Sequence, residues 1–156
     1  MRLHLVFIGK TTFPEVETGI NRYLDRLRSY VPTQIHLVKA EKISSQSTEE
    51  MVKDKEAERV LKLLGKKDCL GIWDQHGKDV DSTGFAKFLD NLRNSGVSDV
   101  WMVIGGPLGV SLRLLARADF VFSLSRMTFP HDLARLMVME QIYRAFTILR
   151  GEPYHK

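Results

Sequence analysis

Short apolar runs that alternate with segments of helical periodicity constrain the fold of this chain more than any other feature. Five runs have the length of a buried strand: residues 3–8, 35–38, 70–73, 100–104 and 120–124. Segments with a helix-like apolar period follow them, over about 15–29, 47–64, 85–92, 111–117 and 132–149. Strict alternation of this kind is typical of a parallel sheet covered by helices on both faces. We therefore predict an α/β fold with a parallel sheet, in a single domain over residues 1–156.

Charge and cysteine content narrow the possible functions only a little. The chain has 23 basic and 19 acidic residues, a net charge of +4 that permits an RNA or anionic partner without requiring one. Cys69 is the only cysteine, so no internal disulfide can form, and its apolar surroundings favour a buried structural thiol over a nucleophile. No run approaches the ~20 apolar residues of a membrane span, and the first apolar run is too short for a secretory signal. We expect a cytoplasmic protein without membrane attachment.

Ligands of open parallel sheets bind beyond the carboxyl ends of the strands. This rule selects three loops: residues 74–78, the glycine cluster 105–109, and residues 123–131. Gly105, Gly106 and Gly109 would let the backbone approach a ligand closely. Their G-G-x-x-G spacing after the fourth strand is not a dinucleotide fingerprint, and no Walker lysine pattern is present. A simple tight turn between strand and helix is the alternative interpretation of these glycines.

The loop after the fifth strand combines several hydroxyl groups with a cation and apolar side chains, which suits a ligand that is partly polar and partly apolar. Pro130, His131 and Asp132 close this loop, and they are also typical of a plain helix start. Earlier in the chain, the capping pattern Ser47-x-x-Glu50 predicts that the second helix begins at Ser47.

The last helix is apolar nearly all round, so it must be covered on most sides, and we expect it to form a subunit interface. Glu140 and Arg144 stand four residues apart and can pair, in a structural or a catalytic role. The chain then ends in Tyr154, His155 and Lys156, where a free, disordered tail is the alternative. The remaining histidines are scattered, and we predict no metal site.

Several motifs in order along the chain resemble one family. They are Leu5-Val6-Phe7-Ile8-Gly9-Lys10, Ile104-Gly105-Gly106-Pro107-Leu108-Gly109, Leu124 through His131, Arg135, Glu140 through Ala145, and Pro153-Tyr154-His155. This set resembles the ribosomal RNA large subunit methyltransferase H family of the SPOUT superfamily, over the whole chain. One departure is Trp73, which stands where a leucine is usual.

The resemblance implies a fold whose C-terminal part is threaded into a trefoil knot, an exception to the usual absence of knots. It also implies a homodimer and S-adenosylmethionine bound in the knot, with the partner chain completing each active site. The implied substrate is a pseudouridine in a hairpin loop of 23S rRNA in the assembled ribosome, methylated at N3. The implied cofactor contacts are Trp73, Gly105, Leu124, Ser125, Arg126, Met127, Thr128 and Phe129.

The reaction itself needs alignment of donor and acceptor, and loss of the N3 proton of the base. His155 is the candidate base, Tyr154 lies beside it, and Arg144 or Arg126 would stabilise the developing charge. Other basic residues, among them Lys10, Arg22 and Arg26, would contact phosphates. Two alternatives stay open: a ribosome-binding or RNA-binding module without a catalytic step, and an enzyme that acts on a small substrate.

Overall fold

The computed structural model describes residues 1–155 and builds them around a five-stranded sheet. The strands are β1 (Arg2–Ile8), β2 (Thr33–Val38), β3 (Cys69–Asp79), β4 (Asp99–Ile104) and β5 (Phe120–Ser123). They lie in the order β2-β1-β4-β3-β5, and every neighbouring pair is parallel. The predicted α/β architecture with a parallel sheet is confirmed.

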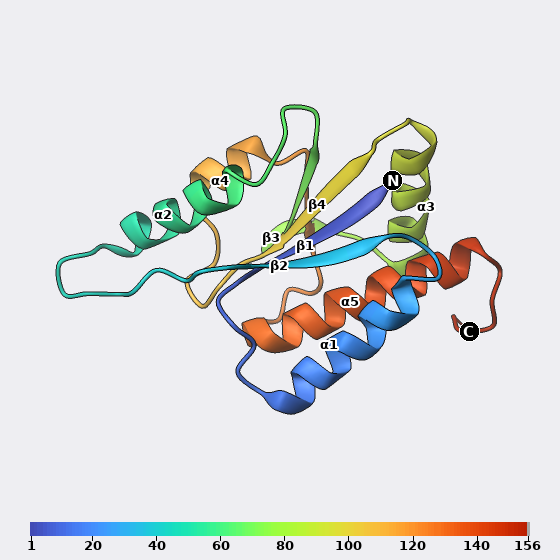
Figure 1. Cartoon of the computed structure of the whole chain (residues 1–156), viewed down its shortest axis with the longest axis horizontal. Coiled ribbons are helices and arrows are strands. Elements are labelled where there is room, and N and C mark those ends of the chain that lie inside the picture. The colour runs from blue at the N-terminus through green and yellow to red at the C-terminus, as the bar shows by residue number, and fades with distance from the viewer. Residues whose placement is uncertain (156) are drawn as a thin grey trace.

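Helices cover both faces of the sheet (Figure 1). They are α1 (Pro14–Leu27), α2 (Glu49–Leu61), α3 (Ser82–Asn94), α4 (Leu112–Arg117) and α5 (His131–Leu149). On one face α5 packs against both α1 and α3, and on the other α2 contacts α4. Because all strands run the same way, the loops after β3, β4 and β5 meet at one edge of the sheet, as the topology rule requires.

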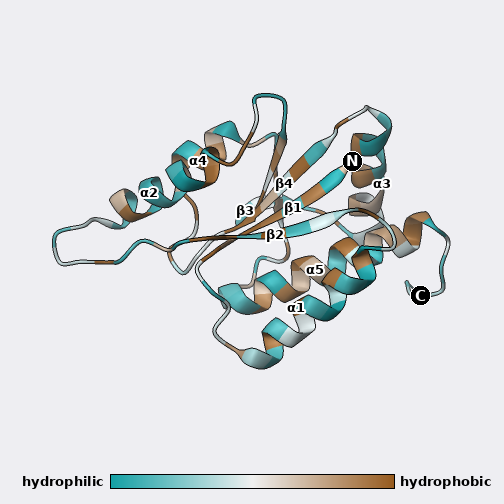
Figure 2. Ribbon diagram, viewed as in Figure 1, coloured by the Kyte–Doolittle hydropathy of each residue, from teal (hydrophilic) through white to brown (hydrophobic). Residues whose placement is uncertain are grey.

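Side-chain alternation along β1 explains why both faces need a cover. Leu3, Leu5 and Phe7 are buried in the cluster that also contains α1, α3 and α5 residues. Val6 and Ile8 point to the opposite face and join the cluster under α2 and α4. Figure 2 shows hydrophobic stretches running through the middle of the sheet, whereas the helices carry hydrophilic and hydrophobic residues in alternation. The strand positions in sequence therefore fix two separate cores.

The start of α2 differs by one residue from the predicted cap. The side chain of Thr48 accepts a hydrogen bond from the backbone N–H of Met51 at 3.2 Å, so Thr48 is the N-cap. Ser47 is engaged elsewhere, since its hydroxyl accepts from the N–H of Ser44 at 2.9 Å in the preceding turn. The local turn competes with capping for the Ser47 hydroxyl, and because Thr48 is the N-cap, the capping-box prediction at Ser47 was wrong.

The segment 74–78, predicted to be a loop, continues β3 as an irregular extension of the strand. β3 pairs with β5 through Trp73, and pairing resumes at Lys78 after a shift in register. Gly77 permits this because a Cβ atom there would lie 2.5 Å from the backbone carbonyl carbon of Phe122. The polar sequence suggested a loop, but the missing side chain at Gly77 lets the two backbones approach and keeps the strand against β5.

The last helix is covered largely within the chain itself. α5 lies between α1 and α3, and most of its apolar side chains are buried or half-buried, whereas Leu133 is 42% exposed. The half-buried apolar side chains leave part of α5 uncovered by its own chain, and the subunit interface expected there stays a prediction. No helix within residues 1–155 is long and apolar enough to cross a membrane.

Candidate active site

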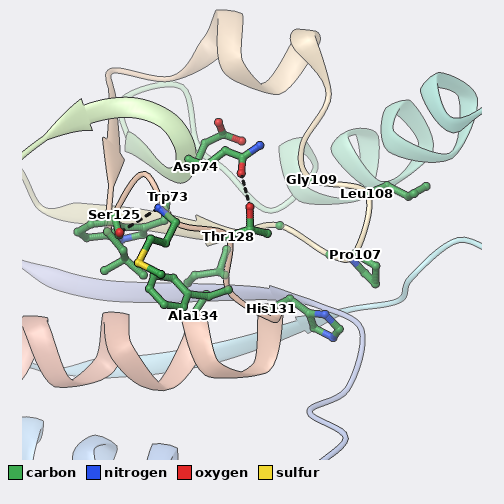
Figure 3. Close-up of a pocket in the computed structure, with 16 residues that line it drawn as sticks. Trp73, Asp74, Pro107, Leu108, Gly109, Ser125, Thr128, His131 and Ala134 are labelled. Atoms are coloured by element: carbon green, nitrogen blue, oxygen red, sulfur yellow. Dashed lines mark hydrogen bonds between the residues drawn. The ribbon is translucent and has the colours of Figure 1, made fainter.

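A pocket of about 280 Å³ lies at the carboxyl edge of the sheet. Its walls come from three segments: the end of the regular part of β3 (residues 73–75), the turn after β4 (104–109) and the loop after β5 (124–131), with Ala134 of α5 beside them. Figure 3 shows Trp73 and Ser125 toward one end of this pocket and Pro107 and His131 toward the other. These are the three segments that the sheet topology had selected from the sequence, although the first is an extension of β3 and not a loop.

The glycine turn after β4 forms one wall because its backbone is unusually tight. Gly106 and Gly109 form an isolated antiparallel bridge, and the N–H of Gly109 donates to the carbonyl oxygen of Gly106 at 2.9 Å. Gly109 has φ +79°, a left-handed conformation that favours glycine. A Cβ atom on Gly105 would lie 3.0 Å from the backbone carbon of Gly109. The turn therefore needs its glycines, and it presents backbone to the pocket.

Hydroxyl groups in the loop after β5 hold the loop itself. Ser123 donates to the carbonyl oxygen of Ser125 at 2.8 Å, and Ser125 accepts from the N–H of Met127 at 3.0 Å. Thr128 reaches across to β3 and donates to the amide oxygen of Gln75 at 3.3 Å (Figure 3). The hydroxyls that the sequence offered as ligand contacts thus stiffen this wall of the pocket and join it to β3.

Trp73 provides a large apolar surface at the pocket and a hydrogen-bond donor without a partner. Its ring lies 5.2 Å from Phe85 and 5.9 Å from Phe122, measured between centroids. Within residues 1–155 its buried Nε1 has no hydrogen-bond partner. Buried donors are normally satisfied, so a bound group that accepts from this indole would complete the site. The combination fits a ligand with an aromatic, nitrogen-containing ring.

A buried ion pair at the start of α5 connects this helix to the loop after β1, next to the pocket. Arg135 is fully buried and donates to Asp132 at 3.2 Å and to the hydroxyl of Thr11 at 3.2 Å. Asp132 also accepts from the N–H of Thr12 at 2.7 Å. Burial lowers the pKa of Arg135, and the charge of Asp132 opposes that shift. These bonds fasten the loop after β1 to the first turn of α5, which carries pocket residues His131 and Ala134.

The sequence motifs include Arg135, but they do not predict its network with Asp132 and the loop after β1. The available signal was a pair of opposite charges three residues apart in an otherwise apolar helix. That spacing predicts a contact between Asp132 and Arg135. It could not predict the partners on the distant loop, since those depend on how α5 docks beside β1.

The structure brings most of the expected cofactor residues together. Those that line the pocket are Trp73, Gly105, Leu124, Ser125, Met127, Thr128 and Phe129. The side chain of Arg126 differs: it is 90% exposed, its Nε lies 3.4 Å from Asp79, and it lines a neighbouring cavity. A cofactor contact of Arg126 would therefore come from its backbone, and it stays a prediction.

The expected catalytic residues form a cluster of their own. Arg144 donates through Nε to Glu140 at 3.0 Å, its guanidinium lies 4.7 Å from the centre of the Tyr154 ring, and its Nη1 lies 3.5 Å from His155 Nδ1. The Tyr154 hydroxyl donates to Glu140 at 3.1 Å. The predicted Glu140–Arg144 pair is thus confirmed, and Tyr154 packs on it as part of an ordered tail. Lys156 lies outside the described residues.

This tail cluster is distant from the pocket within one chain. Arg144 stands ten residues beyond Ala134 on α5, about 15 Å along the helix axis. Figure 1 accordingly shows the C-terminal tail near the far end of α5, away from the segments that form the pocket. Tyr154 and His155 are therefore not among the residues that line the pocket of their own chain.

Cysteine and metal chemistry find no support in the described part of the chain. Burial raises the pKa of the Cys69 thiol to about 11, so the thiolate is scarce at neutral pH. Residues 1–155 contain no group of three or more histidine, cysteine, aspartate or glutamate side chains placed to hold a metal ion.

Comparison with known proteins decides the family. A family model described as "Predicted SPOUT methyltransferase" matches residues 1–155. The chain belongs to the SPOUT methyltransferase family. Relatives of this SPOUT methyltransferase named "Ribosomal RNA large subunit methyltransferase H" include one from Syntrophobacter fumaroxidans, which is 61% identical over 100% of both chains. Another from Acetivibrio thermocellus is 43% identical, also over 100% of both. The resemblance noted in the sequence motifs is confirmed.

A solved structure supports the fold independently of close sequence similarity. "The structure of a probable methylase family protein from Haemophilus influenzae Rd KW20" aligns with 99% of this SPOUT chain and 70% of that chain, with a TM-score of 0.53. The sequences are 15% identical, so this likeness concerns the fold alone.

Proposed function

We propose that this SPOUT methyltransferase transfers the methyl group of S-adenosylmethionine to N3 of a pseudouridine in a hairpin loop of 23S rRNA in the assembled ribosome. The names of the full-length relatives support large-subunit rRNA as the substrate. The single structural observation behind the proposal is the pocket at the carboxyl edge, lined by seven of the eight residues expected to hold the cofactor. The enzyme would act in the cytoplasm, where ribosomes are found.

The pocket residues fit such a cofactor. Trp73 and Leu124 offer apolar surface for an adenine ring, and the orphaned Nε1 of Trp73 offers a donor to it. The glycine turn beginning at Gly105 would bring the backbone close to the ligand. Its polar backbone groups could then bind the ribose and the amino acid part of the cofactor. The cofactor supplies an activated methyl group on a sulfonium. Threading of the C-terminal segments into a trefoil knot, as in the resembled family, would hold these loops around it.

A homodimer would bring the tail of one chain to the pocket of the other. Because Tyr154 and His155 lie at the far end of α5 in their own chain, only a partner's tail can reach the pocket without refolding. There His155 would accept the N3 proton of the base. Arg144, whose pKa is raised by its hydrogen bond to Glu140, stays cationic and would stabilise the developing imidate charge.

Tyr154 would not act as the base in this proposal. Burial and hydrogen bonds to Tyr23 and Glu140 raise the pKa of its phenol far above neutrality. It therefore remains protonated and acts as a hydrogen-bond donor that orders the tail. Its ring also lies against the Arg144 guanidinium, which fixes the direction of that cation.

The test is transfer of labelled methyl from S-adenosylmethionine to purified ribosomes that lack the modification, with the labelled nucleoside identified by mass spectrometry. We expect label in N3-methylpseudouridine of the large-subunit RNA. Label in another nucleoside would keep the methyltransferase and refute the proposed target.

Two further outcomes separate the alternatives. Saturable cofactor binding without transfer to ribosomes would indicate another substrate, including a small molecule. Ribosome binding without cofactor binding would favour a module with no catalytic step. Isothermal titration with S-adenosylmethionine, run beside the transfer assay, distinguishes these cases.

A further inference from the structure

A second cavity adjoins the cofactor pocket on the side of the β3 extension. It has a volume of about 480 Å³ and is lined by Gln75, His76, Gly77, Asp79 and Arg126. Gln75 lines both this cavity and the cofactor pocket, so the two are neighbours. The irregular β3–β5 pairing at Gly77 forms this hollow, because the strand bends past Phe122 before regular pairing resumes.

Two side chains in this cavity can donate hydrogen bonds to an anion. The Arg126 side chain is 90% exposed, and among the described residues only its Nε is engaged, at 3.4 Å from Asp79. Its two terminal nitrogens remain for a ligand, in the fork geometry that suits a phosphate. An exposed ion pair of this length is weak and easily exchanged for a better partner.

His76 is hydrogen-bonded to Asp74, two residues earlier in the chain. Asp74 Oδ1 accepts from the backbone N–H of His76 at 2.9 Å and lies 3.1 Å from its Nδ1. Asp74 itself lines the cofactor pocket, and the His76 side chain is 82% exposed. With Nδ1 beside the Asp74 carboxylate, Nε2 is the ring nitrogen left for an outside ligand, and it donates to an anion in the imidazolium form.

We propose that Arg126 and His76 bind a backbone phosphate of the RNA strand that carries the acceptor base. This inference rests on the proposed function and extends it to a named subsite. The acceptor base must enter the cofactor pocket to meet the methyl group, so its own backbone passes over the rim of that pocket. The cavity that shares Gln75 with the pocket lies at this rim and presents an arginine fork where the phosphate passes.

The position of Arg126 explains how one loop serves two ligands. Its neighbours Ser125 and Met127 line the cofactor pocket, whereas its own side chain turns into the second cavity. The loop can therefore contact the cofactor without using the Arg126 guanidinium. The Asp79 carboxylate competes with the phosphate for that guanidinium and also repels the phosphate. In this arrangement Asp79 therefore weakens RNA binding.

The experiment compares Arg126→Ala, His76→Ala and Asp79→Asn in methyl transfer to ribosomes that lack the modification. The matched control is Arg93→Ala, which removes another exposed arginine paired with an aspartate, Asp90, near the end of α3. For each variant the KM for ribosomes, kcat, the Kd for S-adenosylmethionine and the dependence of kcat/KM on KCl are measured.

We expect Arg126→Ala to raise the KM for ribosomes about tenfold, the effect of losing a charge-assisted hydrogen bond, with an unchanged cofactor Kd. His76→Ala should raise it less. The negative slope of log kcat/KM against log KCl should become shallower by roughly 0.7–0.9 in Arg126→Ala, which is the change expected when one phosphate contact is lost. Asp79→Asn should lower the KM, and Arg93→Ala should leave every value unchanged.

The direction in which Asp79→Asn changes the KM for ribosomes distinguishes phosphate binding by Arg126 from a purely structural role of the Arg126–Asp79 pair. If the Arg126–Asp79 pair only held the loop, both variants would act alike, and an equal rise in KM would overturn the proposal. An unchanged KM in Arg126→Ala, or a weakened cofactor Kd in that variant, would overturn it as well. If the unaltered enzyme transfers no methyl to ribosomes, the proposed function fails; if it does and Arg126→Ala matches it, only the phosphate subsite fails.

Discussion

The guanidinium of Arg135 donates to the backbone carbonyl oxygen of Ile8 at 2.6 Å, a contact between the last helix and the end of the first strand. This bond joins residues 127 positions apart in sequence. Together with the Asp132 pair, it holds the loop after β1 against the helix start that borders the pocket at the carboxyl edge of the sheet. The pocket therefore depends on a buried charge network as well as on its own loops.

Replacing Arg135 by methionine should destabilise the fold by about 3–5 kcal/mol, because it leaves the Asp132 carboxylate buried without its cation. Urea unfolding at a fixed protein concentration measures the change. The double variant Asp132→Asn/Arg135→Met should recover part of the loss, since no unpaired charge remains. A loss below about 1 kcal/mol in the single variant would show that water or rearrangement satisfies Asp132.

Gly77→Ala should disturb the cofactor pocket through the β3–β5 pairing. The added Cβ would meet the Phe122 backbone at 2.5 Å, so the strands must separate, at a cost of about 1–3 kcal/mol. Because β3 carries Trp73 into the pocket, the Kd for S-adenosylmethionine should rise. Gly96→Ala is the control: its φ of +80° makes the substitution strained, but nothing lies within 4 Å. Gly96→Ala should lower thermal stability and leave the Kd unchanged; equal Kd values in the two variants would contradict the prediction.

Glu56 should make the fold less stable as the pH rises. Burial raises its pKa above the ordinary value, although hydrogen bonding from the Glu41 N–H and the charge of Arg59 oppose the shift. The folded state then binds the Glu56 proton more tightly than the unfolded state does. The contribution of Glu56 to the free energy of unfolding therefore decreases as the pH rises from the unfolded pKa to the folded pKa, and it is constant above that.

Glu56→Gln removes this titration while its amide oxygen can still accept the Glu41 N–H at the position seen at 2.9 Å. We expect the variant to gain stability relative to the unaltered chain as the pH rises from about 4 to 7. Urea unfolding at several pH values measures that difference. A difference that shrinks with rising pH would mean that the carboxylate is better stabilised when folded.

Deletion of residues 154–156 should abolish methyl transfer and leave cofactor binding intact, because the tail does not reach its own pocket. The matched experiment mixes this truncation with a chain whose pocket is blocked by Gly105→Trp. Mixed dimers would hold one complete site, with the tail of the second chain and the pocket of the first. Regained activity on mixing supports the crossed site; normal turnover by the truncation alone would refute a role for the tail.

The alternation of apolar runs sufficed to predict the parallel sheet, and the carboxyl-end rule sufficed to find the pocket loops. Both succeed because strand burial is visible in the local sequence, and because a helix between consecutive strands makes those strands parallel. The helix cap at Ser47 and the loop at 74–78 were wrong for one reason. Each residue there has a competing partner, Ser44 for Ser47 and Phe122 for Gly77, that propensity does not reveal.

By itself, the sequence determined the layered fold, the family, and which residues gather at the carboxyl edge. Only the tertiary structure decided that the Arg126 side chain lines the neighbouring cavity, that Arg135 fastens α5 to Ile8, and that Arg144, on which the tail packs, lies about 15 Å along α5 from Ala134 at the pocket. The physical reason is distance along the chain. Periodicity reports which face of an element is buried, whereas contacts between segments more than a hundred residues apart are set by how whole elements dock.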